Sequence, residues 1–305
     1  MIDRIKKISL DYWHISKLTL TGYLDNDAFL YAASIAFSTI FSLPAIILII
    51  LSIGSTFYER DLVQQELINQ VAALIGREST KQIEKVILDA TYDMSSVIAR
   101  VIGIGTLIFS ATTVFISLQT SLNKMWGIKP KPRKGWLKHI INRLLSFSMV
   151  VSLGFVLLVS LVIDTILVLV QKKVDGVFDG LTAHLLSGVN LLVSLAIITL
   201  IFALLFKILP DAKIQWRDVW AGAFITTLLF TLGKYLIGFY LGNSNINSAY
   251  GAAGSFVIVL FWVYFSTLIF LFGAEFTAVH AAHNGKGIIP YKNAVKIKIV
   301  EVPQD

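Results

Sequence analysis

Long apolar runs alternate with short polar segments along most of the chain. Six of these runs are long enough, at a rise of about 1.5 Å per residue, to cross a hydrocarbon core about 30 Å thick as helices. They cover residues 28–57, 97–122, 144–170, 185–209, 219–241 and 254–279. The pattern predicts an all-α, polytopic membrane protein with six transmembrane helices in a membrane domain over residues 28–282.

The composition agrees with this pattern. Hydrophobic residues make up 56% of the 305 residues and charged residues only 15%, and the mean hydropathy is +0.75. A soluble domain carries about 25% charged residues, so the composition excludes an ordinary soluble protein. The chain contains no Cys, which excludes a disulfide and a thiolate metal site.

Two polar regions have helical periodicity but are too short or too polar to span the membrane. Residues 1–27 carry an apolar stripe formed by Met1, Ile5, Ile8, Tyr12 and Ile15. A helix on an anionic membrane surface and a helix packed under the bundle both fit this stripe. Residues 58–97 carry two further stripes separated by Gly76. They predict an amphipathic helical hairpin at the membrane interface.

The basic residues are distributed unevenly between the connections. More than twice as many Lys and Arg lie in residues 1–27, the basic loop 123–143, residues 207–217 and the tail 283–305 as in the other connections. The positive-inside rule therefore predicts that both termini are cytoplasmic and that the 58–97 hairpin is extracytoplasmic. The +7 net charge is then directed at anionic phospholipid on the cytoplasmic face, and we expect no nucleic-acid partner.

Several polar residues fall inside the predicted spans and are candidates for a substrate or ion path. A lone charge at the bilayer centre costs about 2.5–3.5 kcal/mol on insertion scales, so each predicts a partner, water or a function. Asp164 and Lys234 have matched depths, ~10 Å below the predicted outer boundary, which favours an ion pair. Arg100 is a competing partner for Asp164, and Asn190 is a further candidate. A pair that fixes helix packing and a substrate or proton site are equal alternatives.

Glu275 lies near the predicted inner end of the sixth span. Arg143, Lys207 and the Asp25–Asp27 turn share its expected depth. A packing ion pair with Arg143 or Lys207 is one hypothesis for Glu275, and a gating or ion-coupling carboxylate is the other.

Proline and glycine residues mark expected turns and close contacts. Pro44 is expected to kink the first span and Pro210 to end the fourth. The small residues between the fifth and sixth spans allow close backbone approach to a helix or to a ligand, and the Gly273-Ala274-Glu275 motif closes the charge-free stretch 256–272 of the sixth span. The candidates for helix turns and packing are Pro44, Pro210, Tyr250, Gly251, Gly254 and Gly273.

The histidines do not form a metal-binding pattern in the sequence. Only His280 and His283 lie close together, three residues apart, and no acidic residue follows nearby. Metal-dependent hydrolysis needs clustered His and carboxylate ligands. We therefore expect no metal, no cofactor and no enzymatic activity.

Several motifs within residues 25–282 occur together. They are Asp27–Phe37 followed by Ser42-Leu43-Pro44, Lys207–Asp211, Ser248–Ser255, Trp262-Val263-Tyr264 and Gly273-Ala274-Glu275. In these motifs the chain resembles the YihY/BrkB family of bacterial membrane proteins, of the UPF0761 type. The resemblance implies six spans in a bacterial inner membrane and links to transport, envelope lipid export and virulence. An older family label, ribonuclease BN, does not fit the scattered histidines.

Two functions remain in competition. The first is a transporter or flippase-like exporter of an envelope lipid or other amphiphile, which requires buried charges between the helices. The second is a non-transporting membrane scaffold for envelope assembly, which would use the surface of the 58–97 hairpin.

Overall fold

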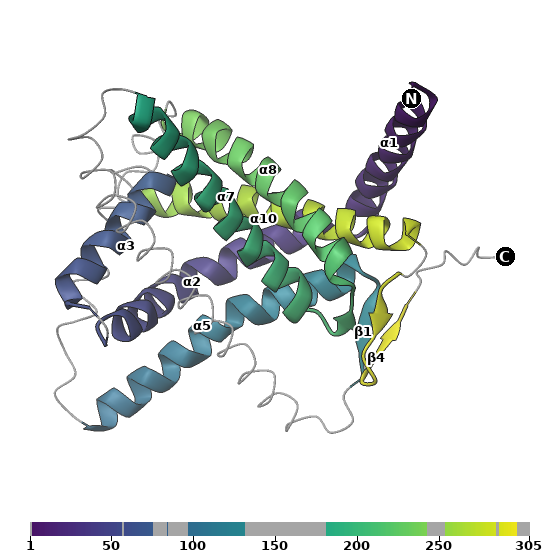
Figure 1. Ribbon diagram of the computed structural model, residues 1–305. Helices are drawn as coiled ribbons and strands as arrows, with labels where there is room; N and C mark the ends of the chain where they lie inside the picture. Colours follow the sequence, from purple (N-terminus) through teal and green to yellow (C-terminus); the bar gives the residue numbers. More distant parts are fainter. Residues whose placement is uncertain are drawn as a thin grey trace.

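The computed structural model describes residues 2–56, 58–75, 84, 97–131, 181–242, 254–284 and 287–297, and this part of the chain is mostly helical (Figure 1). The helices are α1 (Ile2–Asp25), α2 (Ala28–Gly54), α3 (Arg60–Ile75), α5 (Val97–Met125), α7 (Leu181–Ile208), α8 (Trp216–Gly242) and α10 (Gly254–His283). The strands are β1 (Ile128–Pro130), β2 (Ala212–Lys213), β3 (Ile289–Pro290) and β4 (Ala294–Lys296).

Three helices in the described part of the chain are long and apolar enough to cross a membrane. The candidate spanning segments are Leu191–Ile208 of α7, Trp216–Tyr240 of α8 and Phe256–His283 of α10, and α2 contributes a shorter apolar stretch, Ala28–Ser42. The predicted third span and the second half of the predicted hairpin lie outside the described residues. The total of six spans, the N-in/C-in orientation and the hairpin therefore stay predictions.

The connection between α1 and α2 is a tight turn at Asn26 and Asp27. Asp27 has a φ of 56°, in the left-handed region that Asp and Asn adopt more readily than most residues. The backbone N–H of Asn26 donates to the carbonyl of Gly22 at 3.0 Å. α2 then continues as one helix through Pro44, so Pro44 does not end it, and a kink there stays a prediction.

The last turns of α1 pack against α10. Ile15, Thr19 and Tyr23, spaced four residues apart, are buried, whereas Trp13 on the opposite face is 72% exposed. Figure 1 shows the N-terminal end of α1 extending away from the bundle. The hypothesis of a helix packed on the bundle is therefore right for this half of α1.

Helices α8 and α10 form an antiparallel pair that meets through glycines and threonines. A Cβ atom on Gly222 would lie 1.7 Å from Oγ1 of Thr277, and one on Gly273 would lie 1.7 Å from Oγ1 of Thr226. Each threonine hydroxyl donates to the carbonyl of the glycine four residues earlier on its own helix, at 2.7 Å. The absent glycine side chains leave the room that the threonines fill. α10 continues past Gly273 to His283, a few residues beyond the predicted end of the sixth span at residue 279.

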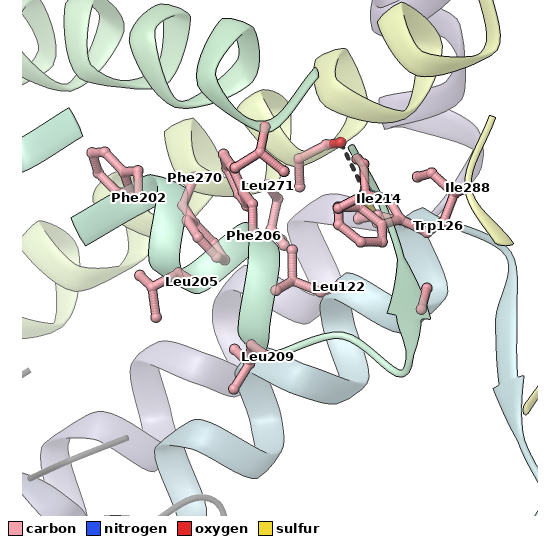
Figure 2. Close-up of a cluster of buried hydrophobic side chains, with 14 of the residues drawn as sticks. Leu122, Trp126, Phe202, Leu205, Phe206, Leu209, Ile214, Phe270, Leu271 and Ile288 are labelled. Atoms are coloured by element: carbon pink, nitrogen blue, oxygen red, sulfur yellow. Dashed lines mark hydrogen bonds between the residues drawn. The ribbon is translucent and has the colours of Figure 1, made fainter. Parts of the chain in front are cut away.

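A hydrophobic cluster joins the ends of α5, α7 and α10 to the strands (Figure 2). Phe206 of α7 stacks on Phe270 of α10 with ring centroids 5.1 Å apart. Further buried members of the cluster are Leu122, Trp126, Phe202, Leu205, Leu209, Ile214, Leu271 and Ile288.

The strands modify the all-α prediction. β1 pairs antiparallel with β4, and β2 pairs antiparallel with β3. Residues 287–297 thus return from α10 across the segments that follow α5 and α7. Strands of two or three residues are too short for an alternation of apolar and polar residues to be recognised in the sequence. Their pairing brings three of the segments predicted to be cytoplasmic to one end of the bundle.

Candidate functional site: polar contacts at one end of the bundle

Polar side chains meet where α5, α7 and α10 end and α2 and α8 begin. We call this group the basal polar layer, and it consists of Asn26, Asn123, Trp126, Asp211, Asp218, Glu275 and His280. Except for Glu275, which lies inside α10, its members come from helix ends or short connections. Helix ends have backbone groups without an intrahelical partner, so polar contacts concentrate there.

Glu275 is an acidic member of the layer that lies inside α10, away from both ends of the helix. Its side chain is 6% exposed. Its Oε2 accepts from Nδ2 of Asn26 at 3.4 Å, and the same nitrogen lies 3.5 Å from the carbonyl of Met125. Its Oε1 faces α1, where a Cβ atom on Gly22 would lie 2.2 Å from it. Within the described ranges, no Lys, Arg or His forms an ion pair with this carboxylate.

The predicted neighbours of Glu275 differ in whether they contact its carboxylate. The Asp25–Asp27 turn does reach it, through Asn26. Lys207 does not, because its ammonium donates to the carbonyl of Ile214 and lies 5.4 Å from the ring centroid of Trp216. Lys207 therefore stabilises the connection between α7 and α8, and the predicted Glu275–Lys207 pair was wrong. Arg143 lies outside the described residues.

Tyr23 of α1 makes a further contact with α10. Its hydroxyl donates to the carbonyl of Leu268 at 3.2 Å. Burial, with a smaller contribution from nearby Tyr264, raises the pKa of the Tyr23 phenol well above its usual range. The hydroxyl therefore stays protonated and keeps its donor role at any physiological pH.

Two contacts join the end of α5 to its neighbours. The indole Nε1 of Trp126 donates to the carbonyl of Ala274 at 2.9 Å, and Trp126 is 3% exposed. The amide of Asn123 donates to Oδ2 of Asp211 at 2.9 Å, and its Oδ1 accepts from the backbone N–H of Asp211 at 2.9 Å. Sequence reasoning missed these residues, although a paired Asn and Trp at the end of an apolar helix is a signal for such contacts.

Asp218, in the first turn of α8, is the acidic partner of His280. Its Oδ1 lies 3.1 Å from Nδ1 of His280 and accepts from Nδ2 of Asn284 at 2.9 Å. The carboxylate is 2% exposed. No acidic residue follows His280 closely along the sequence, but in space the carboxylate of Asp218 lies beside it. In the part of the chain with described side chains, no group of three or more potential ligands forms a metal site.

Of the other predicted path residues, Lys234 has a described side chain. Lys234 is half-buried in α8, and its proposed partner Asp164 lies outside the described residues. Arg100 belongs to α5 and Asn190 to α7, with side chains outside the described set. The structure thus leaves the Asp164–Lys234 pair a prediction.

The turn and packing candidates also fall into separate places. Pro210 is buried directly after α7, and Gly254 is the buried first residue of α10. Gly273 lies at the α8–α10 crossing. Tyr250 and Gly251 lie outside the described residues.

Comparison with known proteins identifies relatives over most of the chain. The family described as "Virulence factor BrkB" matches residues 19–295. A UPF0761 membrane protein of Alteromonas mediterranea is 28% identical over 248 residues, which covers 81% of this chain and 80% of the relative. A UPF0761 membrane protein of Pseudoalteromonas atlantica is 27% identical over 250 residues, covering 81% and 79%.

Some relatives are longer. A UPF0761 membrane protein of Janthinobacterium sp. is 28% identical over 253 residues, and the match covers 81% of this chain but 55% of the relative. No solved structure matches the chain. Because the family match runs from the last turns of α1 through α10 and into β4, the chain belongs to the BrkB family of membrane proteins.

Proposed function

We propose that the protein is a transporter that exports an envelope lipid or another amphiphile across the bacterial inner membrane. The observation that supports this proposal is Glu275, a buried carboxylate in a helix able to cross the membrane, without a basic partner in the described part of the chain. Ionisable residues inside membrane helices are costly, and they commonly mark substrate or ion pathways.

The contacts of Glu275 are weak for a purely structural carboxylate. A buried charge used for packing is normally matched by a cation or by several N–H donors. Among the described residues, Glu275 instead receives one long hydrogen bond, from the side chain of Asn26 in a turn between two helices. Movement of the α1–α2 turn away from α10 would therefore open the carboxylate to the predicted inner side. We assign Glu275 the role of an inner-gate carboxylate that takes up a proton or a cation.

The scaffold alternative has its own observation. Leu62 of α3 is 60% exposed, at the start of the amphipathic segment predicted to lie outside. A partner protein docked on α3 would cover such a residue. The two functions therefore place the essential residues at opposite ends of the molecule.

The Glu275→Gln variant tests the proposal in cells that lack the gene. Glutamine has nearly the same size and can still accept from Asn26, so we expect normal membrane levels together with loss of complementation. Glu59→Gln, an exposed position before α3, is the matched control and should complement fully. Full activity of Glu275→Gln combined with loss of activity in Leu62→Ser would contradict export and favour the scaffold.

A further inference from the structure

We propose that the cleft between α1 and α10 binds the acyl chain of an anionic amphiphile and loads it toward the inner gate. Loading toward the inner gate rests on the proposed function, but binding of the amphiphile to the cleft can be measured separately. The cleft has a volume of about 520 Å³, within the range of small-molecule sites.

The walls of the cleft are mainly aliphatic. Ile15 and Leu18 of α1 face Val279 and Ala282 of α10. These α10 residues belong to its last turns, which end the apolar segment Phe256–His283. An apolar cleft at the end of a spanning helix is suited to a hydrocarbon chain that enters from the adjacent leaflet.

The polar part of the cleft has the chemistry to bind an anion. His14 of α1 and His283 of α10 line it, and both are exposed. An imidazole N–H donates to phosphate or carboxylate oxygens, and the protonated ring adds a positive charge. Lys17, exposed one turn after His14, does not line the cleft but adds a permanent positive charge on the same helix. Asp11 lies one turn before Ile15 but does not line the cleft.

The position of Gly22 connects the cleft to the buried carboxylate. Gly22 lines the cleft, and its missing side chain would lie 2.2 Å from Oε1 of Glu275. The backbone of one glycine is therefore the wall between the cleft and the proposed inner gate. α1 carries this wall, and Figure 1 shows α1 reaching the bundle only through its last turns.

A second groove in the described region provides an internal comparison. It lies between α2 and α10, has a volume of about 220 Å³ and is lined by residues that include Ala33, Phe37 and Phe261. None of the described residues that line it is a histidine, lysine or arginine. Any lipid-facing groove takes up hydrocarbon, so selectivity for an anionic headgroup is what distinguishes the α1–α10 cleft.

The experiment uses the natural absence of Cys. The full chain with the single change Ala282→Cys, at the exposed rim of the cleft, is labelled with a thiol-reactive fluorophore and placed in nanodiscs. Quenching is compared for phosphatidylglycerol and phosphatidylcholine with the same brominated acyl chains. We expect quenching at a several-fold lower mole fraction of phosphatidylglycerol. Ala33→Cys in the second groove should respond equally to both lipids.

A second pair of changes tests whether the histidines cause the preference for phosphatidylglycerol. In the Ala282→Cys background, His14→Phe with His283→Phe keeps the rings but removes the N–H donors, and the preference for phosphatidylglycerol should disappear. Equal quenching by both lipids at position 282, or a preference that survives the histidine changes, would overturn the proposal. No quenching by either lipid would also overturn it and would indicate that protein fills the cleft. A selective cleft in a protein that moves no lipid would disprove export while leaving the binding site intact.

Discussion

Trp126→Ala is expected to lower the free energy of unfolding by about 3–5 kcal/mol, the usual cost of removing a fully buried aromatic side chain. Trp126 is 3% exposed and lies in the cluster that joins α5 to α10 and the strands (Figure 2). The substitution also leaves the carbonyl of Ala274 without its indole donor. The measurement is reversible unfolding of the purified protein in mixed micelles.

Two further variants separate the loss of the hydrogen bond from the loss of buried volume and provide a control. Trp126→Phe keeps most of the volume but loses the hydrogen bond, and should cost about 1–3 kcal/mol. Trp13→Ala, at a position that is 72% exposed, is the matched control and should leave stability nearly unchanged. If Trp126→Ala unfolded like Trp13→Ala, the described packing at the end of α5 would be wrong.

Gly222→Ala is expected to destabilise the protein by about 1–3 kcal/mol, although it adds a single methyl group. The added carbon would lie 1.7 Å from Oγ1 of Thr277 and 3.3 Å from the carbonyl oxygen of Gly273. The α8–α10 pair must therefore separate or shift to accept it. Thermal unfolding of the variant, scored against the parent, measures the effect.

The chain offers a control on the same helix. Gly238 of α8 has no atom within 4 Å of the position where its Cβ would lie, so Gly238→Ala should be neutral or slightly stabilising. Adding Thr277→Ala to Gly222→Ala removes the closest atom and should restore part of the lost stability. Equal effects of the two glycine changes would mean that α8 and α10 do not meet at Gly222.

The helices that carry the spans could be predicted from the apolar runs. The expected start of the first span, Ala28, is the first residue of α2, and the expected spans 219–241 and 254–279 lie within α8 and α10. Such boundaries are local: Asp27 with its positive φ precedes α2, and Pro210 follows α7. Local signals of this kind are present in the residues themselves.

The contacts of the basal polar layer could not be predicted in the same way. Asn26 and Glu275 are 249 residues apart, and Asp218 and His280 are 62 apart. Which helix ends meet depends on how the helices pack, and no single segment encodes that. The prediction for Glu275 named Arg143, Lys207 and the Asp25–Asp27 turn as neighbours of suitable depth. Asn26 of that turn contacts the carboxylate, whereas the side chain of Lys207 binds elsewhere.

The most direct test of export is lipid movement in vesicles of defined composition. The purified protein is reconstituted with phosphatidylglycerol that carries a headgroup fluorophore, and a membrane-impermeant reductant reports how much label reaches the outer leaflet, with and without an imposed proton gradient. We predict that the parent protein moves the labelled lipid and that Glu275→Gln, reconstituted at the same level, does not. Equal label movement in parent, Glu275→Gln and protein-free vesicles under both conditions would contradict lipid export and the gating role of Glu275.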